Sequence, residues 1–372
     1  MIPVRKTPIA GSLGALLAIL CAGCGGRSMP KPSPIPAHLF VTNSGDDTIS
    51  NFVIDSQTGT LTPAGTPIPV MPAHVPGAMA LVNNSLLLVA NQGSNNTSVY
   101  KFEAGSGTLT AASGSPFSDS GGMHMGIAVH PSNKFVYITS TPVGVITLQL
   151  DLATGALSAV PGSPFGFSDD SNPTLDVAGK YLYTTGFRTI RVNSVDSTTG
   201  ALTPIQGSPF PFVFNNMTGM TFHPSGKFLY GVEDGYLNLH TYDVNSSTGV
   251  LQEAQGSPTL QTAVDPWNIV VEPHGKFAFT PNTSRGTVAT WQIDPVAGTL
   301  SWVGEVRAGT VPIYITLDAT GTFVYVANYR SSNVSAYKID AATGALSPVA
   351  GSPFAVGSFP AGVIASHSLG GL

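Results

Sequence analysis

The ionisable residues that could do chemistry are few, because Asp, Glu, Lys and Arg together make up only 9% of the 372 residues. Hydrolysis of an acyl compound requires a general base for the attacking water and a positive group for the developing oxyanion. Candidates for the base are His124 and Glu233. The candidates for the positive, substrate-binding group are Arg188, Arg285 and Arg330. All five fall near the ends of predicted strands, so we expect them in loops, outside the repeated skeleton of the fold.

A repeated unit predicts the elements that must position these residues. Seven copies of the pattern Gly-x-Leu follow one another at regular intervals of 45 to 49 residues, with the glycines Gly59, Gly107, Gly155, Gly200, Gly249, Gly298 and Gly344. Helical repeats would not tolerate 42 glycines and 30 prolines, whereas propeller blades are four short strands joined by tight turns. The repeat therefore predicts an all-β fold: a closed seven-bladed β-propeller with four-stranded antiparallel blades.

One copy of the repeat shows how a blade is expected to be built. Residues 312–317 are short and apolar and predict the innermost strand, beside the channel. Residues 323–327 are apolar throughout, as expected of a strand that neighbouring blades cover on both faces. Residues 334–339 alternate and predict a strand nearer the edge, and the outermost strand begins within 346–349.

The two ends of the array complete each other. Residues 38–42 match a second strand without its innermost partner, and residues 359–365 match an innermost strand without a successor. Pairing them completes the last blade with the N- and C-terminal strands and leaves no open sheet edge. We therefore place the propeller at residues 38–367, followed by a tail at 368–372.

Many of the acids and three of the histidines have the spacing of structural turn residues, which argues against a catalytic or ligand-binding role for them. Six residues before the repeated leucines stand Asp55, Glu103, Asp151, Asp196, Asn245, Asp294 and Asp340. Asp and Asn at such positions close a turn by bonding its backbone. The turns His130-Pro131, His223-Pro224 and Glu272-Pro273-His274 occupy equivalent hairpins, on the face opposite the expected site. We interpret both sets as structural.

The loops between second and third strands, and between blades, are expected to converge at one mouth of the channel, where a propeller most readily binds a ligand. This mouth would collect Asp46, Asp47, Asp119, Asp169, Asp170, Glu233, Asp234 and Asp265, with Arg188, Arg285, Arg307, Arg330, His74 and His124. The alternative is that these are ordinary solvated loop charges. We expect no metal or other cofactor, with Ca²⁺ on the carboxylates as a lesser alternative.

Two stretches resemble the seven-bladed lactonase family, the 6-phosphogluconolactonase-like propellers related to YVTN-type repeat proteins. They are FHPSGKFLYGVED at 222–234 and VYVANYRSSNVSAYKIDAATGALSPV at 324–349. The resemblance covers residues 38–367 and implies hydrolysis of a sugar-derived lactone at the channel mouth. Where the family has Pro-His-x-His, residues 122–126 keep one histidine, His124. Glu233-Asp234 and Arg285-Gly286 lie near a Glu and an Arg of the family, whereas 216–219 lack its Gly-Pro-Arg-His signature.

The N-terminus has the features of an export signal. Arg5 and Lys6 precede a mostly apolar run at 9–20, which is too short to span a bilayer. The run is followed by Cys21-Ala-Gly-Cys24. This segment resembles a bacterial lipobox, so we expect a lipoprotein-type signal peptide at 1–23 and lipidation of Cys24. An ordinary cleaved signal with an incidental cysteine is the alternative. A Pro-rich tether follows at 24–37, and the propeller itself has no cysteine.

The composition and the expected export limit the kinds of partner that the protein could bind. A net charge of −5 gives no basic excess, which argues against nucleic acid. The resemblance implies a small-molecule lactone. The missing signature and the expected export favour instead a non-catalytic periplasmic or cell-surface propeller that binds a protein or carbohydrate, and a purely structural envelope protein is a third possibility. We expect a monomer, held at the cell envelope only by a lipid anchor and otherwise periplasmic or secreted.

The lipid anchor is testable. Cys24→Ser should move the protein from the membrane fraction to the soluble periplasmic fraction, because the tether offers no other apolar anchor. Cell fractionation followed by immunoblotting measures this, with Cys21→Ser as the matched control. Unchanged membrane association of Cys24→Ser would contradict lipidation at this residue.

Overall fold

The computed structural model describes residues 35–119, 121–166, 168–212, 217–233, 238–260 and 265–368. The predicted signal peptide, Cys24, nearly all of the tether, Asp234 and most of the predicted tail lie outside these residues. Every regular element in the described part is a β-strand. In this part we find no helix of the length and apolarity that a membrane span requires.

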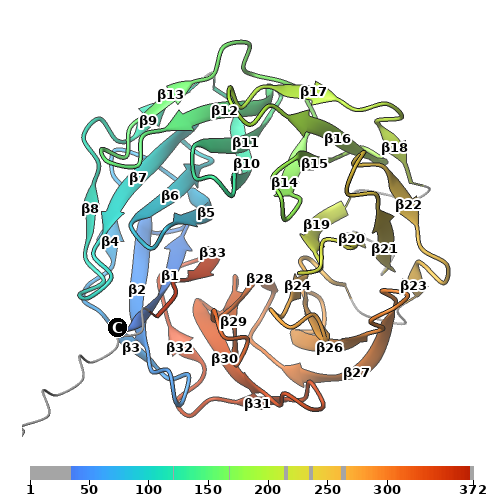
Figure 1. Ribbon diagram of the computed structural model, residues 1–372. Helices are drawn as coiled ribbons and strands as arrows, with labels where there is room; N and C mark the ends of the chain where they lie inside the picture. The colour runs from blue at the N-terminus through green and yellow to red at the C-terminus, as the bar shows by residue number, and fades with distance from the viewer. Residues whose placement is uncertain are drawn as a thin grey trace, which may run out of the picture.

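The strands form seven antiparallel sheets that stand as blades around a central channel, as Figure 1 shows. Blades are numbered by the order of their innermost strands, and each is given from the innermost strand outward. Blade 1 is β5 (Pro76–Val82), β6 (Leu86–Asn91), β7 (Asn96–Phe102) and β8 (Leu109–Ala111). Blade 2 is β10 (Met123–Val129), β11 (Phe135–Thr141), β12 (Gly144–Leu150) and β13 (Leu157–Ala159). Blade 3 is β14 (Ser171–Leu175), β15 (Tyr181–Gly186), β16 (Thr189–Val195) and β17 (Leu202–Pro204).

The other four blades have the same order. Blade 4 is β19 (Met217–Phe222), β20 (Phe228–Glu233), β21 (Asn238–Val244) and β22 (Leu251–Glu253). Blade 5 is β24 (Val270–Val271), β25 (Phe277–Asn282), β26 (Thr287–Ile293) and β27 (Leu300–Arg307). Blade 6 is β28 (Pro312–Leu317), β29 (Phe323–Asn328), β30 (Asn333–Ile339) and β31 (Leu346–Pro348). Blade 7 is β33 (Pro360–Ala365), β1 (Ala37–Asn43), β2 (Thr48–Ile54) and β3 (Leu61–Pro63).

Five blades carry a further two-residue strand that pairs with the third strand. These are β4 (Ile68–Pro69), β9 (Phe117–Ser118), β18 (Phe210–Pro211), β23 (Thr259–Leu260) and β32 (Phe354–Ala355). The blade predicted from one repeat is confirmed, because all four expected strands of blade 6 are present. Every residue of β29 is buried, as its continuous apolar sequence indicates.

The predicted ring closure is confirmed. Strand β1 pairs along one side with β2 and along the other with β33, so the two ends of the chain share blade 7. In Figure 1 β33 (red) lies beside β1 (blue). Outside the ladder, the His38 N–H donates to Ser366 Oγ at 2.7 Å, and the Ser366 N–H donates to the His38 carbonyl at 2.8 Å.

Neighbouring blades are joined by a recurring tyrosine–glycine contact. The hydroxyl groups of Tyr183, Tyr230 and Tyr325, each on a second strand, donate to the carbonyls of Gly249, Gly298 and Gly59 in the next blade at 2.9–3.1 Å. Burial raises the pKa of each of these tyrosines, so the hydroxyl keeps its proton and remains a donor. The acceptors are the glycines of the Gly-x-Leu repeat, which therefore mark the junctions between blades.

Six of the seven repeated residues cap turns as predicted, whereas the Glu103 side chain accepts a hydrogen bond from the Ser106 hydroxyl at 3.3 Å. Oδ1 of Asp340 accepts hydrogen bonds from the N–H groups of Ala342 and Thr343 at 3.0 and 2.9 Å. Asp55, Asp151, Asp196, Asn245 and Asp294 bind the equivalent pairs of N–H groups. The backbone hydrogen bonds hold the pKa of Asp340 below its ordinary value.

The His-Pro turns lie where the sequence places them. They join first to second strands, whereas the channel mouth is formed by loops that join second to third strands. We name these two ends of the propeller the turn face and the mouth face. Nε2 of His130 contacts the Gly179 carbonyl at 2.9 Å, and His223 contacts the Gly275 carbonyl at 3.0 Å. Both histidines therefore connect adjacent blades, and their structural interpretation holds.

The repeat glycines generate a stability prediction. Gly344 has φ +74°, and a Cβ at this position would lie 2.5 Å from the ring of Phe277 in blade 5. Left-handed backbone costs about 1–2 kcal/mol for a non-glycine residue, and overpacking about 1–3 kcal/mol. Gly344→Ala should lower the free energy of unfolding by ~2–5 kcal/mol in urea titrations. Gly105→Ala is the control, since nothing lies within 4 Å of its Cβ position, and equal losses would contradict the argument.

Candidate functional site in the central channel

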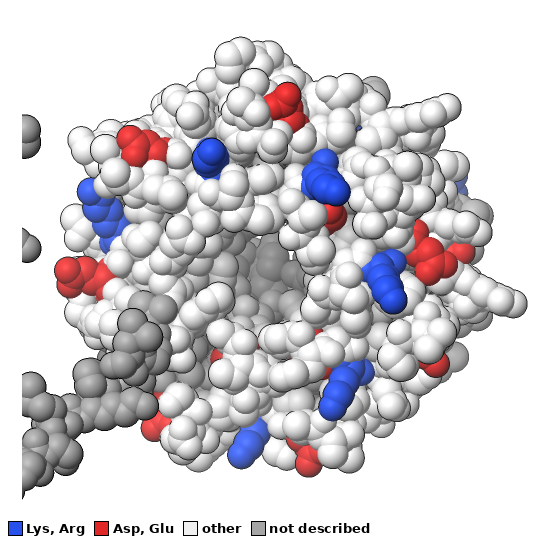
Figure 2. All heavy atoms as spheres, in the orientation of Figure 1, with Lys and Arg blue, Asp and Glu red and all other residues white. Residues whose placement is uncertain are grey.

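A cavity of about 750 Å³ opens on the mouth face and runs into the channel. All seven blades contribute to its wall, mainly through their innermost strands or the residues that lead into them: Ala78, Met79, Met125, Gly126, Ile127, Asn172, Pro173, Thr174, Met217, Thr218, Gly219, Met220, Trp267, Asn268, Tyr314, Ile315, Gly362 and Val363. Figure 2 looks along the channel and shows charged side chains spread singly over the blades, most of them away from the central hollow.

The wall combines aromatic and uncharged polar groups. Trp267, Tyr314 and Phe187 line it together with amide and hydroxyl side chains, among them Asn172 and Thr218. Among the described residues that line the cavity, Asp169 is the one with a charged side chain. Aromatic rings beside amide and hydroxyl groups bind the apolar and polar faces of a small polar ligand.

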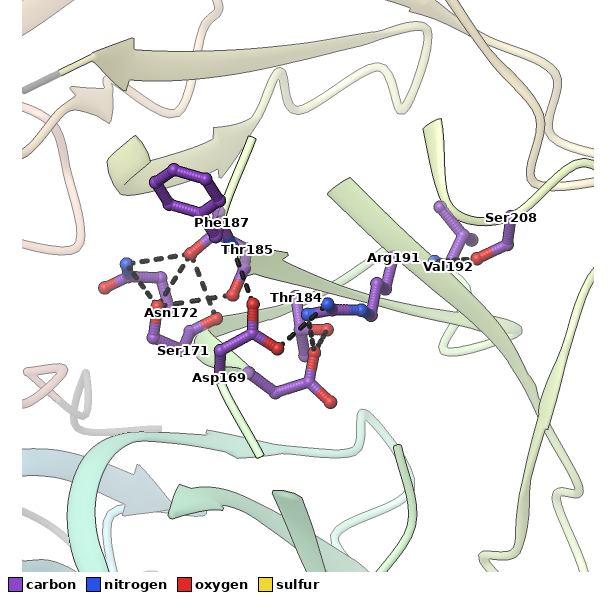
Figure 3. Close-up of polar contacts among 10 residues, drawn as sticks. Asp169, Ser171, Asn172, Thr184, Thr185, Phe187, Arg191, Val192 and Ser208 are labelled. Carbon is purple, nitrogen blue, oxygen red and sulfur yellow. Dashed lines mark hydrogen bonds and ion pairs between the residues drawn. The ribbon is translucent and has the colours of Figure 1, made fainter. Parts of the chain in front are cut away.

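Asp169 is held by two fixed donors, as Figure 3 shows. One carboxylate oxygen accepts the Phe187 N–H at 2.7 Å, and the other lies 2.8 Å from a guanidinium nitrogen of Arg191. Burial raises the pKa of Asp169, but these two donors outweigh burial and hold the pKa below its ordinary value. Its side chain is 42% exposed, so an ionised carboxylate reaches the cavity.

Arg191 occupies a position where other blades have a serine that takes part in a repeated hydrogen-bond set. In blade 6, Asn328 at the end of β29 donates to Asn333 and to Ser335 on β30, at 2.7 and 2.9 Å. Blades 7 and 1 have the same bonds from Asn43 to Thr48 and Ser50, and from Asn91 to Asn96 and Ser98.

Blade 3 instead has Gly186 in the asparagine position and Arg191 in the serine position. A Cβ on Gly186 would lie 1.9 Å from the guanidinium, so glycine leaves the room that Arg191 occupies. The same guanidinium lies 3.0 Å from the buried Asp170, whose Oδ1 also accepts from Thr184 Oγ1 at 2.8 Å.

Two further polar residues, Thr218 and Asn268, line the cavity. The hydroxyl of Thr218 is buried and has no hydrogen-bond partner among the described residues. The side-chain oxygen of Asn268 accepts the Ile269 N–H at 2.7 Å, which leaves the Nδ2 group as a donor. A ligand oxygen in the cavity can therefore receive a hydrogen bond from the neutral amide of Asn268.

The expectation that His124 and Glu233 lie in loops was wrong. His124 is in β10, is 1% exposed and contacts Asp119 at 3.1 Å. Glu233 ends β20, is fully buried, and accepts from Asn238 Nδ2 at 2.7 Å, with His240 Nε2 at 3.4 Å. Glu233 occupies the asparagine position of the repeat, and neither residue lines the cavity.

The three predicted arginines lie on the mouth face but are not brought together. Arg188 lies over the ring of Phe187, with its guanidinium carbon 5.9 Å from the ring centroid. Arg285 pairs with Glu305 at 2.9 Å in blade 5, and Arg330 is exposed on the loop after β29. None of them lines the cavity.

Several of the acids predicted for the mouth connect one loop to another. Asp47 binds the Val75 N–H and His74, Asp46 binds the Ser358 N–H, and Asp265 binds the Thr283 hydroxyl. The described part of the chain has no group of three His, Cys, Asp or Glu placed to hold a metal ion. The predicted acidic mouth is thus distributed over separate loops, and of its acids Asp169 lines the channel cavity.

Comparison with protein families gives one match. Residues 33–125 and 174–359 match the family described as lactonase, 7-bladed beta-propeller. No match was found among curated proteins.

Solved structures share the fold at low sequence identity. A proposed 6-phosphogluconolactonase of Bacteroides fragilis is 17% identical, with a TM-score of 0.75 over 91% of this chain and 100% of its own. The periplasmic gluconolactonase PpgL of Pseudomonas aeruginosa is 18% identical, with a TM-score of 0.72 over 88% and 98% of the two chains. At these identities the likeness shows the fold alone.

The burial of Glu233 generates a prediction about unfolding. Glu233→Ala removes an acceptor from buried Asn238 and should cost about 1–3 kcal/mol in urea titrations without ligand. Arg330→Ala is the control and should change stability by less than about 0.5 kcal/mol, because Arg330 is exposed. A Glu233→Ala protein as stable as the wild type would contradict a role of Glu233 in the fold.

Proposed function

Because the chain belongs to the lactonase seven-bladed β-propeller family, we propose that it binds a sugar-derived lactone in the central channel and hydrolyses it. The observation that carries the proposal is Asp169, an ionised carboxylate on the wall of a 750 Å³ cavity otherwise lined by uncharged residues in the described part. The name of the P. aeruginosa neighbour, a periplasmic gluconolactonase, agrees with this class of substrate.

The chemistry needs a base, a water molecule and donors for the oxyanion. Asp169 takes a proton from water as the water oxygen attacks the lactone carbonyl carbon. Asn268 Nδ2 donates to the oxyanion that forms on the carbonyl oxygen. The ring C–O bond then breaks, and the proton held by Asp169 passes to the departing alkoxide. The product is the open-chain hydroxy acid.

The wall favours an uncharged substrate. Trp267 and Tyr314 place aromatic side chains on the wall for the apolar side of a sugar, and the amide and hydroxyl side chains suit its hydroxyls. The described lysines and arginines lie off the cavity wall, so a phosphorylated lactone would enter without a cationic partner there. The proposed substrate is therefore an unphosphorylated sugar lactone.

A second candidate function is sugar binding without turnover. It is favoured by the two donors on Asp169, which lower its pKa and so weaken it as a base. In this case the same wall would hold a neutral carbohydrate, and the carboxylate would only accept hydrogen bonds from its hydroxyls.

We also propose that the protein is exported and held by a lipid on Cys24, as the signal and tether sequences suggest. Strand β1 begins at Ala37, opposite Ile54 and next to the Asp55 turn, so the described chain starts at the turn face. A tether from this end leaves the mouth face turned away from the membrane.

Asp169→Asn tests the proposed activity. With gluconolactone as substrate, kcat should fall by about 10²–10⁴-fold, because the amide cannot accept the water proton. Binding measured by Trp267 fluorescence should persist. Wild-type turnover should fall at acid pH as Asp169 is protonated, below the ordinary carboxyl range because its pKa is lowered. Asp265→Asn, whose carboxylate binds Thr283 outside the cavity, is the matched control.

The outcomes separate the two functions. Binding of gluconolactone without turnover by the wild type would support the sugar-binding function and overturn the hydrolase. Turnover that survives Asp169→Asn would overturn the role of Asp169. Absence of both binding and turnover would overturn the channel as a lactone site.

A further inference from the structure

A second cavity, of about 430 Å³, lies between blades 5 and 6 on the turn face, at the opposite end of the propeller from the channel mouth. Its wall is built from the turn after β24, the turn after β28 and the turn after β30: Glu272, His274, Lys276, Phe277, Thr320, Gly321, Thr322, Lys338, Ile339, Asp340 and Ala341. The proposed lactonase function does not use this cavity.

The equivalent place at two other junctions is bridged by histidine. His130 in blade 2 reaches the Gly179 carbonyl of blade 3, and His223 in blade 4 reaches the Gly275 carbonyl of blade 5. The corresponding pair at the junction of blades 5 and 6 is Glu272 and Gly321. An ionised carboxylate only accepts hydrogen bonds, so it cannot bind a carbonyl oxygen as an imidazole N–H does.

Glu272 instead turns back onto its own loop. It accepts the N–H groups of Lys276 and His274 at 2.6 and 2.7 Å, and His274 Nδ1 at 2.8 Å. Burial raises its pKa, but these hydrogen bonds hold the pKa below the ordinary value, so the carboxylate stays ionised. The bridge between the blades is therefore missing where the cavity opens.

Two ammonium groups remain available to this cavity. Lys276 and Lys338 line it, and neither side chain has a hydrogen bond or ion pair within the described residues. The acids beside them are engaged: Glu272 by its turn, and Asp340 by the N–H groups of Ala342 and Thr343. Asp318 is engaged as well, by the Thr320 hydroxyl and by the N–H groups of Thr322 and Phe323. The Thr320 hydroxyl also contacts that of Thr322, at 2.7 Å. The two ammonium groups are therefore the charged groups of this wall that have no hydrogen-bond or ion-pair partner among the described residues.

We propose that this cavity is a second binding site, for a small multivalent anion such as a phosphate monoester or a dicarboxylate. Lys276 and Lys338 supply the charge from two different blades, so a bound anion replaces the missing histidine bridge. Charge-assisted hydrogen bonds of this kind are about twice as strong as neutral ones. The occupant would also stabilise the propeller, since it joins blades 5 and 6 only in the folded state.

The chain itself supplies the design of the first test. Glu272→His with His274→Ser converts this turn into the sequence of the blade 4 turn, His223-Pro-Ser-Gly-Lys227. The new histidine should bond to the Gly321 carbonyl and fill the cavity. Calorimetric titration with inorganic phosphate and, separately, with succinate should show binding to the wild type and none to this double variant. The two probes distinguish a phosphate ligand from a dicarboxylate.

The second test keeps the proposal falsifiable if the turn variant does not fold. Lys276→Met with Lys338→Met should weaken binding of the effective probe at least about tenfold, because both charge-assisted hydrogen bonds to the anion are lost. Lys227→Met, at the equivalent position of blade 4, should leave binding unchanged. Wild type that binds neither probe at millimolar concentration, or lysine variants that bind as the wild type does, would overturn the site.

Discussion

The structure depends on the contact between the second strand of one blade and the repeat glycine of the next. The glycine carbonyl accepts the tyrosine hydroxyl at the junctions that begin at Tyr183, Tyr230 and Tyr325. The same glycines lie against aromatic rings of the preceding blade, as Gly59 does on Phe323 and Gly344 on Phe277. A side chain there would force adjacent blades apart, which is a physical reason for the regular spacing of Gly-x-Leu along the chain.

Because this skeleton repeats, its exceptions are informative. In blades that keep the asparagine at the end of the second strand, its amide donates hydrogen bonds to side chains of the third strand, as Asn328 does to Asn333 and Ser335. Blade 3 replaces this set with Gly186 and Arg191, which positions Asp169 at the channel. Blade 5 replaces a bridging histidine with Glu272, beside the second cavity. The first proposed site lies where blade 3 departs from the repeat, and the second lies at a junction that no histidine of this turn bridges.

The channel wall links the fold to the proposed chemistry. Seven innermost strands bring aromatic and neutral polar side chains around one carboxylate, and the donors on that carboxylate keep it ionised. Several charges of the mouth face bind the backbone of a neighbouring loop, as Asp47 does with Val75. The mouth therefore fixes loop geometry, and the ligand chemistry lies deeper, in the channel.

The sequence by itself determined the architecture. Turn glycines, apolar second strands and two incomplete ends at His38 and Phe359 predict seven blades and their closure, because such signals are local and repeat in every copy. Only the tertiary structure decided which charges face the cavity. His124 and Glu233 follow the same local patterns as loop residues but are buried at strand ends. Asp169 reaches the channel because Arg191, 22 residues later, fits beside Gly186. This ion pair depends on where the two side chains point and on the space beside Gly186, and neither can be read from residue types and spacing along the chain.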